Sequence, residues 1–88
     1  MMQLVSNLDL AAARPLWAQL CAARRQPIAL DASSVERLGG LCLQVLVAAK
    51  RAWQDDGVSF AIVQPSQSFT DAVRLMAADE LMTAEGCA

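Results

Sequence analysis

The sequence predicts an α/β fold, a small sheet of three or four strands with helices packed on it. Short apolar segments at residues 2–5, 28–30 and 59–63 alternate with longer segments of helical periodicity. Such alternation is typical of helices layered on a sheet. The strand segments IAL and FAIV are apolar throughout, as in parallel strands covered by helices. The 88 residues are therefore expected to form a single domain, residues 1–88.

The first helix is predicted within residues 8–26, with Asp9 as its N-cap. Apolar residues that recur at helical spacing are expected to face the core: Ala13, Leu16, Trp17, Leu20 and Cys21. Pro15 falls in the first turns, where the amide that it lacks has little or no intrahelical partner. Arg24 and Arg25 are expected to close the helix at its negative end.

The second helix is predicted from Gly39 or Gly40 to Gln54. Its buried stripe is expected to hold four apolar residues, with Ala49 at the margin: Leu43, Leu46, Val47 and Trp53. Lys50 falls on the same stripe, and its stem is expected to lie along apolar surface with the charge in water. Gly57 is expected to stop the helix after the loop residues Asp55 and Asp56.

The third helix is predicted from Phe69 to about Met76 after a turn at Pro65 and Ser66, with Ser68 as its cap. Phe69, Val73 and Met76 are expected to face inward. One more helical turn is expected from Ala77 to Met82, followed by a frayed end.

Composition excludes several functional classes. The net charge is −2 with a pI of about 4.8, and no basic patch dominates, so nucleic acid is not an expected partner. No apolar run approaches the ~20 residues of a membrane span, and no secretory signal is seen. Three cysteines without a CxxC pair fit a reduced, cytoplasmic protein, with Cys21 and Cys42 as small buried hydrophobes. Cys87 lies near the end of the chain, and thiol chemistry is predicted to be dispensable.

Few residues suggest catalysis, and no cofactor or metal is expected. The chain has no histidine, which removes the commonest general base and metal ligand. Ser33 and Ser34 therefore lack an activating base and are expected to cap a loop. The carboxylate pairs Asp55-Asp56 and Asp79-Glu80 are contiguous, which favours solvated charge over acid–base work. Met76 and Met82 are expected to fill the core, as are Trp17 and Trp53, with an interface role as the alternative for one indole.

Gly39 and Gly40 precede the second helix without a phosphate-loop pattern, since neither GxxxxGK[ST] nor GxGxxG is present. Two interpretations stay open and are compatible. The glycines either form a tight turn with close backbone approach, or leave a bare surface that another protein can approach.

The segment IALDASSVERLGGLCLQVLVAAKRAWQDDGVSFAIVQPSQSFTDAVRLM resembles the bacterial STAS domain, the sulfate-transporter and anti-sigma-factor-antagonist family. The family pattern is a strand ending in D-x-S-x-V, a helix opened by D-[ST]-[ST]-[GA]-L-x-x-L, another strand, then P-S-x-x-[FV] and a final helix. Residues that match this pattern, or the family's L-D start of the first helix, are Leu8, Asp9, Asp31, Ser33, Val35, Leu43, Leu46, Pro65, Ser66 and Phe69. The resemblance covers about residues 4–82, and its weight lies in the order and spacing of these pieces.

The resemblance implies a STAS fold and a protein partner. In the anti-sigma-antagonist type, a Ser or Thr that opens the second helix is phosphorylated by a partner kinase. That acceptor position falls on Gly40, which has no hydroxyl, so the resemblance implies no phosphorylation switch. It also implies that part of the family's first strand or hairpin is missing. The expected partner-binding residues are Ser33, Ser34, Gly39, Gly40 and Leu41.

Three hypotheses about function follow. The first is a non-enzymatic signalling module in stress, chemotaxis or two-component circuits, which binds a histidine kinase or an anti-sigma-like protein. The alternative is an accessory subunit of an ABC-type lipid transport complex, bound to the transporter ATPase. A small ligand under the helix layer is the third, although the small size and the absence of a cofactor motif count against it. The oligomeric state stays open.

Overall fold

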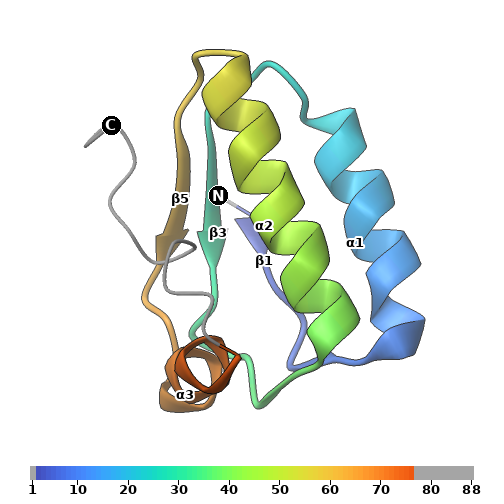
Figure 1. Ribbon diagram of the computed structural model, residues 1–88, viewed down its shortest axis with the longest axis vertical. Helices are drawn as coiled ribbons and strands as arrows, with labels where there is room; N and C mark the ends of the chain where they lie inside the picture. Colours follow the sequence, from blue (N-terminus) through green and yellow to red (C-terminus); the bar gives the residue numbers. More distant parts are fainter. Residues whose placement is uncertain (1, 77–88) are drawn as a thin grey trace.

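The computed structural model describes residues 2–76, which fold into an α/β unit with parallel strands. The elements follow in the order β1 (Met2–Gln3), β2 (Asn7–Leu8), α1 (Leu10–Ala22), β3 (Ile28–Asp31), β4 (Arg37–Leu38), α2 (Gly40–Asp55), β5 (Phe60–Val63) and α3 (Gln67–Leu75). Helices α1 and α2 lie side by side over one face of the main sheet, and α3 lies at the end toward which the strands point (Figure 1). The predicted α/β class is confirmed.

The main sheet has the strand order β1-β3-β5, and all its pairs are parallel. Its register places Leu30 between Met2 and Ile62, and the Leu30 side chain is fully buried. A second, two-stranded parallel sheet pairs β2 with β4 and was not predicted. Each of these strands has two residues, too few for the alternation that marks a strand in sequence.

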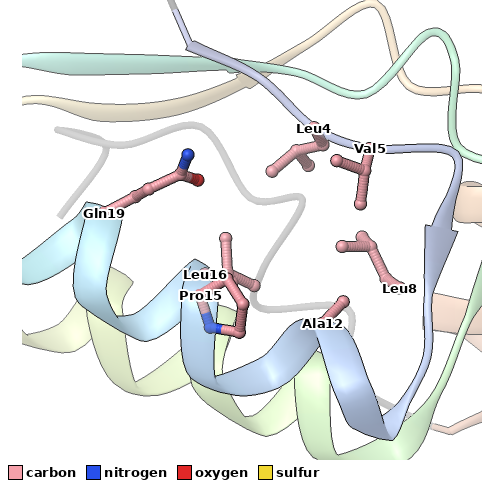
Figure 2. Close-up of a pocket in the computed structure, with 7 residues that line it drawn as sticks. All are labelled: Leu4, Val5, Leu8, Ala12, Pro15, Leu16 and Gln19. Atoms are coloured by element: carbon pink, nitrogen blue, oxygen red, sulfur yellow. The ribbon is translucent and has the colours of Figure 1, made fainter.

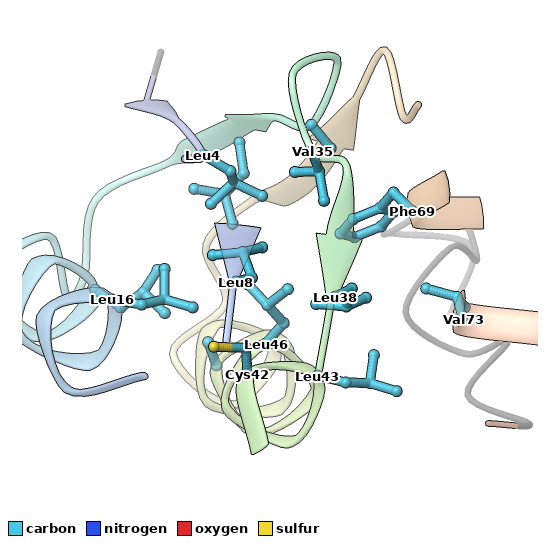
Figure 3. Close-up of a cluster of buried hydrophobic side chains, with 14 of the residues drawn as sticks. Leu4, Leu8, Leu16, Val35, Leu38, Cys42, Leu43, Leu46, Phe69 and Val73 are labelled. Atoms are coloured by element: carbon cyan, nitrogen blue, oxygen red, sulfur yellow. The ribbon is translucent and has the colours of Figure 1, made fainter. Parts of the chain in front are cut away.

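The core lies between the main sheet and the two long helices and continues to α3 (Figure 3). Trp53 is its largest member, and its ring meets Phe60 edge-on with centroids 5.7 Å apart. The indole N–H donates to the carbonyl oxygen of Gln26 at 2.7 Å, so this buried polar group is satisfied. The prediction of Trp53 as a core residue is confirmed. Lys50 was predicted to keep its charge in water. The residue is only 5% exposed, so it is buried more deeply than this prediction requires.

Two predictions for α1 were wrong. Trp17 is 50% exposed and Cys21 is also exposed, because the helix buries a narrow stripe of Ala13, Leu16 and Leu20 at three- and four-residue spacing. Trp17 and Cys21 follow members of that stripe by one residue, which turns them about 100° away from it.

The two ends of α1 differ in how well the sequence predicted them. Asp9 caps the helix as expected, with a carboxylate oxygen that accepts from the Ala12 amide at 3.1 Å. The other end comes earlier than expected, at Ala22, so Arg24 and Arg25 do not close the helix. The guanidinium of Arg24 instead reaches the carboxylate of Asp56 beyond the end of α2, at 3.0 Å.

The prediction of Ser68 as the cap of the third helix was also wrong. Ser66 caps α3, and its hydroxyl oxygen accepts from the Phe69 amide at 3.0 Å. Met76 follows the end of this helix and is 38% exposed, so it does not fill the core as predicted. Gly57, with φ of +71°, follows the last turn of α2 as expected. The expectations for Ala77–Met82, Asp79-Glu80 and Cys87 lie outside the described residues.

Candidate functional site: the start of helix α2

Gly39 and Gly40 differ sharply in their surroundings. A Cβ on Gly39 would lie 3.2 Å from the Leu8 carbonyl oxygen and 3.9 Å from the Asp9 Cα, both backbone atoms. A Cβ on Gly40 would have Met76 Sδ as its nearest neighbour, at 4.0 Å, which is ordinary contact. Gly39 is therefore a packing residue of a tight turn, whereas Gly40 is an exposed position with room for a side chain.

Two apolar side chains with exposed area lie next to Gly40, and a third lies at the start of α1. Leu41 is 46% exposed, and Met76 comes from the end of α3. Leu10, 76% exposed, begins α1 directly after Asp9, whose backbone lies against Gly39. We call these four residues, Leu10, Gly40, Leu41 and Met76, the helix-start surface. Exposed apolar groups grouped in this way are typical of interaction sites.

The N-terminus of α2 lacks a side-chain cap. Gly39 occupies the N-cap position and offers no side-chain acceptor, and no acidic residue lies in the first turn. By contrast, Asp9 caps α1 and Ser66 caps α3. The first amides of α2 have no intrahelical acceptors, as in any α-helix. A partner can therefore approach the backbone of α2 closely here without meeting a capping side chain.

Cys42 links the start of α2 to the start of α1 through a hydrogen bond. Its side chain is fully buried, and the thiol donates to the carbonyl oxygen of Asp9 at 3.2 Å. Burial raises the pKa of the Cys42 thiol, and the negative charge of Asp9 raises it further. Cys42 therefore stays protonated at neutral pH and acts as a structural residue, as the sequence predicted.

Ser33 and Ser34 lie in the loop between β3 and β4, also at the carboxyl ends of the strands. The backbone amide of Ser33 donates to Asp31 Oδ1 at 2.8 Å, and the side-chain amide of Gln3 donates to Ser34 Oγ at 2.9 Å. The hydroxyl of Ser33, and then its amide, hold the pKa of Asp31 below its ordinary value. Among residues 2–76, these hydrogen bonds tie Ser33 to Asp31 of β3 and Ser34 to Gln3 of β1, two strands of the main sheet. Gly40 has a different neighbour, Met76 at the end of α3.

The described residues contain no group of three His, Cys, Asp or Glu side chains that would hold a metal ion. Within residues 2–76, no helix combines the length and the apolar character that a membrane crossing requires. What the helix-start surface offers is backbone amides and apolar contact area, which suit the binding of another protein.

Two members of this surface were missed from the sequence. Met76 was assigned to the core because it follows Phe69 and Val73 at helical spacing, but α3 ends at Leu75 and the stripe ends with it. Leu10 was not singled out at all. Its position directly after the N-cap was a usable signal, since Ala13 and Leu16 already account for the buried side of that part of α1.

The family comparison agrees with the fold. A family model described as "Mlab, STAS domain" matches residues 1–83, so the chain belongs to the STAS domain family. The resemblance and the STAS-like fold predicted from the sequence are thereby confirmed. Members of this family are generally non-catalytic modules of protein–protein interaction and signalling. No curated protein and no solved structure matched the chain.

Proposed function

We propose that this chain is a non-enzymatic interaction module of bacterial signalling, acting in the cytoplasm. It binds a regulatory kinase or an anti-sigma-like protein through the helix-start surface, with Ser33 and Ser34 in the neighbouring loop. The single observation that carries the proposal is Gly40, an exposed first residue of α2 with no side chain, between the apolar groups of Leu41 and Met76.

The chemistry of the surface favours a protein partner. Leu10, Leu41 and Met76 leave apolar area in water, and covering such area is the main source of affinity at protein interfaces. Gly40 lets the partner's backbone come close to α2, and Gly39 holds the turn behind it. We expect the partner to place an apolar side chain between Leu41 and Met76.

The same position argues against a phosphorylation switch. The resemblance aligns the family's acceptor Ser or Thr with Gly40, which offers no oxygen to a kinase. Incubation with the cognate kinase and ATP should leave the intact mass unchanged. A stoichiometric phosphate on Ser33 or Ser34 would contradict this part of the proposal.

The binding test uses two surface variants. A pull-down from the native cell with mass spectrometry identifies the partner, and calorimetric titration then measures its affinity. Leu41→Asp should cost about 2 kcal/mol of binding, as the loss of a central apolar anchor does. Gly40→Arg should weaken binding by steric bulk. Both positions are exposed, so neither variant should lower the free energy of unfolding by more than about 0.5 kcal/mol.

Ala48→Asp supplies the matched control, since Ala48 is exposed further along α2. It should bind the partner like the wild type. If Leu41→Asp and Gly40→Arg melt like the wild type and also bind like it, the helix-start surface is not the site. If both unfold, the start of α2 is only a packing turn.

A second candidate is an accessory subunit of an ABC-type lipid transport complex that binds the transporter ATPase. The observation in its favour is again the missing hydroxyl at Gly40, because a permanent subunit needs no switch between bound and free states. The pull-down separates the candidates, since it recovers either a transporter ATPase or a signalling protein. Recovery of the ATPase with wild-type affinity for Leu41→Asp would reject the proposed surface but retain the transporter role.

A further inference from the structure

The main sheet ends at β1 although helix α1 extends beyond it. In Figure 1, the strands β5, β3 and β1 follow one another across the sheet, and α1 lies to the far side of β1. Strand β1 pairs with β3 along one edge, and the Leu4 amide continues the pairing by donating to the Asp31 carbonyl oxygen at 2.9 Å. Among residues 2–76, no strand pairs with the other edge of β1.

A pocket of about 230 Å³ lies between this edge and α1. Leu4, Val5 and Leu8 line one side, and the flank of α1 from Ala12 to Gln19 lines the other (Figure 2). Among residues 2–76, every lining residue except Gln19 is apolar. An apolar cavity of about 150 Å³ holds a benzene molecule, so this one has room for a side chain as large as leucine or phenylalanine.

The edge lacks two of the common devices that prevent strand addition. Natural edge strands are protected by shortness, by charged residues, by proline or by a bulge. Strand β1 is short, with two residues, but the segment around it carries no charge and no proline. Residues 2–5, MQLV, contain neither charge nor proline, and Val5 is 58% exposed beside the pocket. In a parallel pair, alternate residues direct their backbone groups to opposite edges. Because Leu4 bonds to β3, the backbone groups of Gln3 and Val5 face the free edge.

We propose that this edge accepts an extended segment of a partner protein as an added strand, with an uncharged aliphatic side chain in the pocket. Strand addition takes affinity from main-chain hydrogen bonds and specificity from pockets for alternate side chains. None of the described residues that line the pocket is ionisable, so a charged side chain would lose its hydration without gaining a partner there.

A second copy of this chain fits the edge less well than a single peptide strand. Joined edge to edge with its helices on the same face, it would bring its own α1 over the region that α1 and α2 of the first copy already cover (Figure 1). The space beside β1 therefore suits one strand without a helix attached. The inference is independent of the helix-start surface, which uses other side chains.

The probe is a capped, uncharged pentapeptide of alternating threonine and leucine, titrated into ¹⁵N-labelled protein. The amide signals of Gln3, Val5 and the pocket flank of α1 should shift together. A version with aspartate in place of leucine should bind at least tenfold more weakly. Methylation of the peptide amides that face β1 should weaken binding similarly, whereas methylation of those that face away should not.

Val5→Lys places a charge at the pocket from an exposed position, so the protein should fold and bind the peptide at least tenfold more weakly. Ala12→Trp should do the same by filling the pocket, and Ala48→Trp and Leu41→Asp should bind like the wild type. The proposal is overturned if the peptide shifts no signal at this edge, if Val5→Lys binds normally, or if both methylated peptides bind equally. Light scattering that shows a dimer disrupted by Val5→Lys would assign the edge to a second copy instead.

Discussion

The backbone amide of Gly39 donates to the carbonyl oxygen of Leu8 at 2.8 Å, and a Cβ on Gly39 would stand 3.2 Å from the same oxygen. This bond extends the pairing of β2 with β4 and sets the start of α2 against the start of α1. A side chain at residue 39 would have to push this oxygen back by a few tenths of an ångström and lengthen the bond, so this approach favours a residue without a side chain. Gly40 has no such close contact. Gly39 is therefore a structural glycine, and Gly40 is a surface glycine.

Alanine at the two glycines should therefore have opposite effects. Gly39→Ala should lower the free energy of unfolding by about 1 kcal/mol or more, because the new methyl group crowds the Leu8 carbonyl. Gly40→Ala should raise it by up to about 1 kcal/mol, because alanine has less freedom to lose in the unfolded chain and meets no close neighbour. Urea unfolding of both variants measures the difference. Equal effects would mean that the two positions are equivalent after all.

Serine at position 40 should restore the acceptor that the family pattern places there. The nearest neighbour of a Cβ is Met76 Sδ at 4.0 Å, so a hydroxyl fits and the free energy of unfolding should not fall by more than about 0.5 kcal/mol. With a kinase that phosphorylates STAS antagonists, intact-mass measurement should show one added phosphate on Gly40→Ser and none on the wild type. Phosphate on both proteins would place the acceptor elsewhere, and Ser33→Ala and Ser34→Ala would then locate it.

The two tryptophans should report different environments. Trp53 is 1% exposed and hydrogen-bonded to Gln26, whereas Trp17 is 50% exposed. Acrylamide should therefore quench the fluorescence of Trp53→Phe, which retains Trp17, far more than that of Trp17→Phe. The latter should unfold like the wild type, while Trp53→Ala should lose about 3–5 kcal/mol of stability. Strong quenching in Trp17→Phe would contradict the burial of Trp53.

The α/β class, the three strands of the main sheet and the cap at Asp9 could be predicted because each leaves a local pattern in the sequence. The errors have a common cause. Trp17 and Cys21 continue the apolar pattern of α1, but how wide a stripe a helix buries depends on the elements that pack against it. The different roles of Gly39 and Gly40 depend on Leu8 and Met76, which are distant in sequence and become neighbours only in the fold.

The thiols of Cys21 and Cys42 should differ in reactivity. Cys21 is exposed, while Cys42 is fully buried with its pKa raised by burial and by Asp9. In a Cys87→Ser background, Ellman's reagent should titrate one thiol in the native protein and two after denaturation, since the chain has three cysteines. Cys21→Ser should remove the native reaction without loss of stability. Rapid reaction that persists in the Cys21→Ser, Cys87→Ser double variant would mean that Cys42 is accessible.

The bonds from Ser33 to Asp31 should make part of the stability depend on pH. They lower the pKa of Asp31 from its ordinary value of 3.8, so the folded state favours the carboxylate more than the unfolded state does. The resulting stability is fully present above the unfolded pKa and is lost as the pH falls through the lower, folded pKa. Ser33→Ala removes the hydroxyl bond, so the Asp31 pKa should rise toward its ordinary value, as a carboxyl-detected NMR titration can measure.

The Ser33→Ala variant should be less stable than the wild type at pH 7. Urea unfolding should show this difference in stability shrinking in acid, below the Asp31 pKa of both proteins. Ser34→Ala is the control, because its hydroxyl accepts from Gln3 instead, and it should leave the Asp31 titration unchanged. An Asp31 pKa that is the same in the wild type and Ser33→Ala would show that the hydroxyl of Ser33 does not hold this carboxylate.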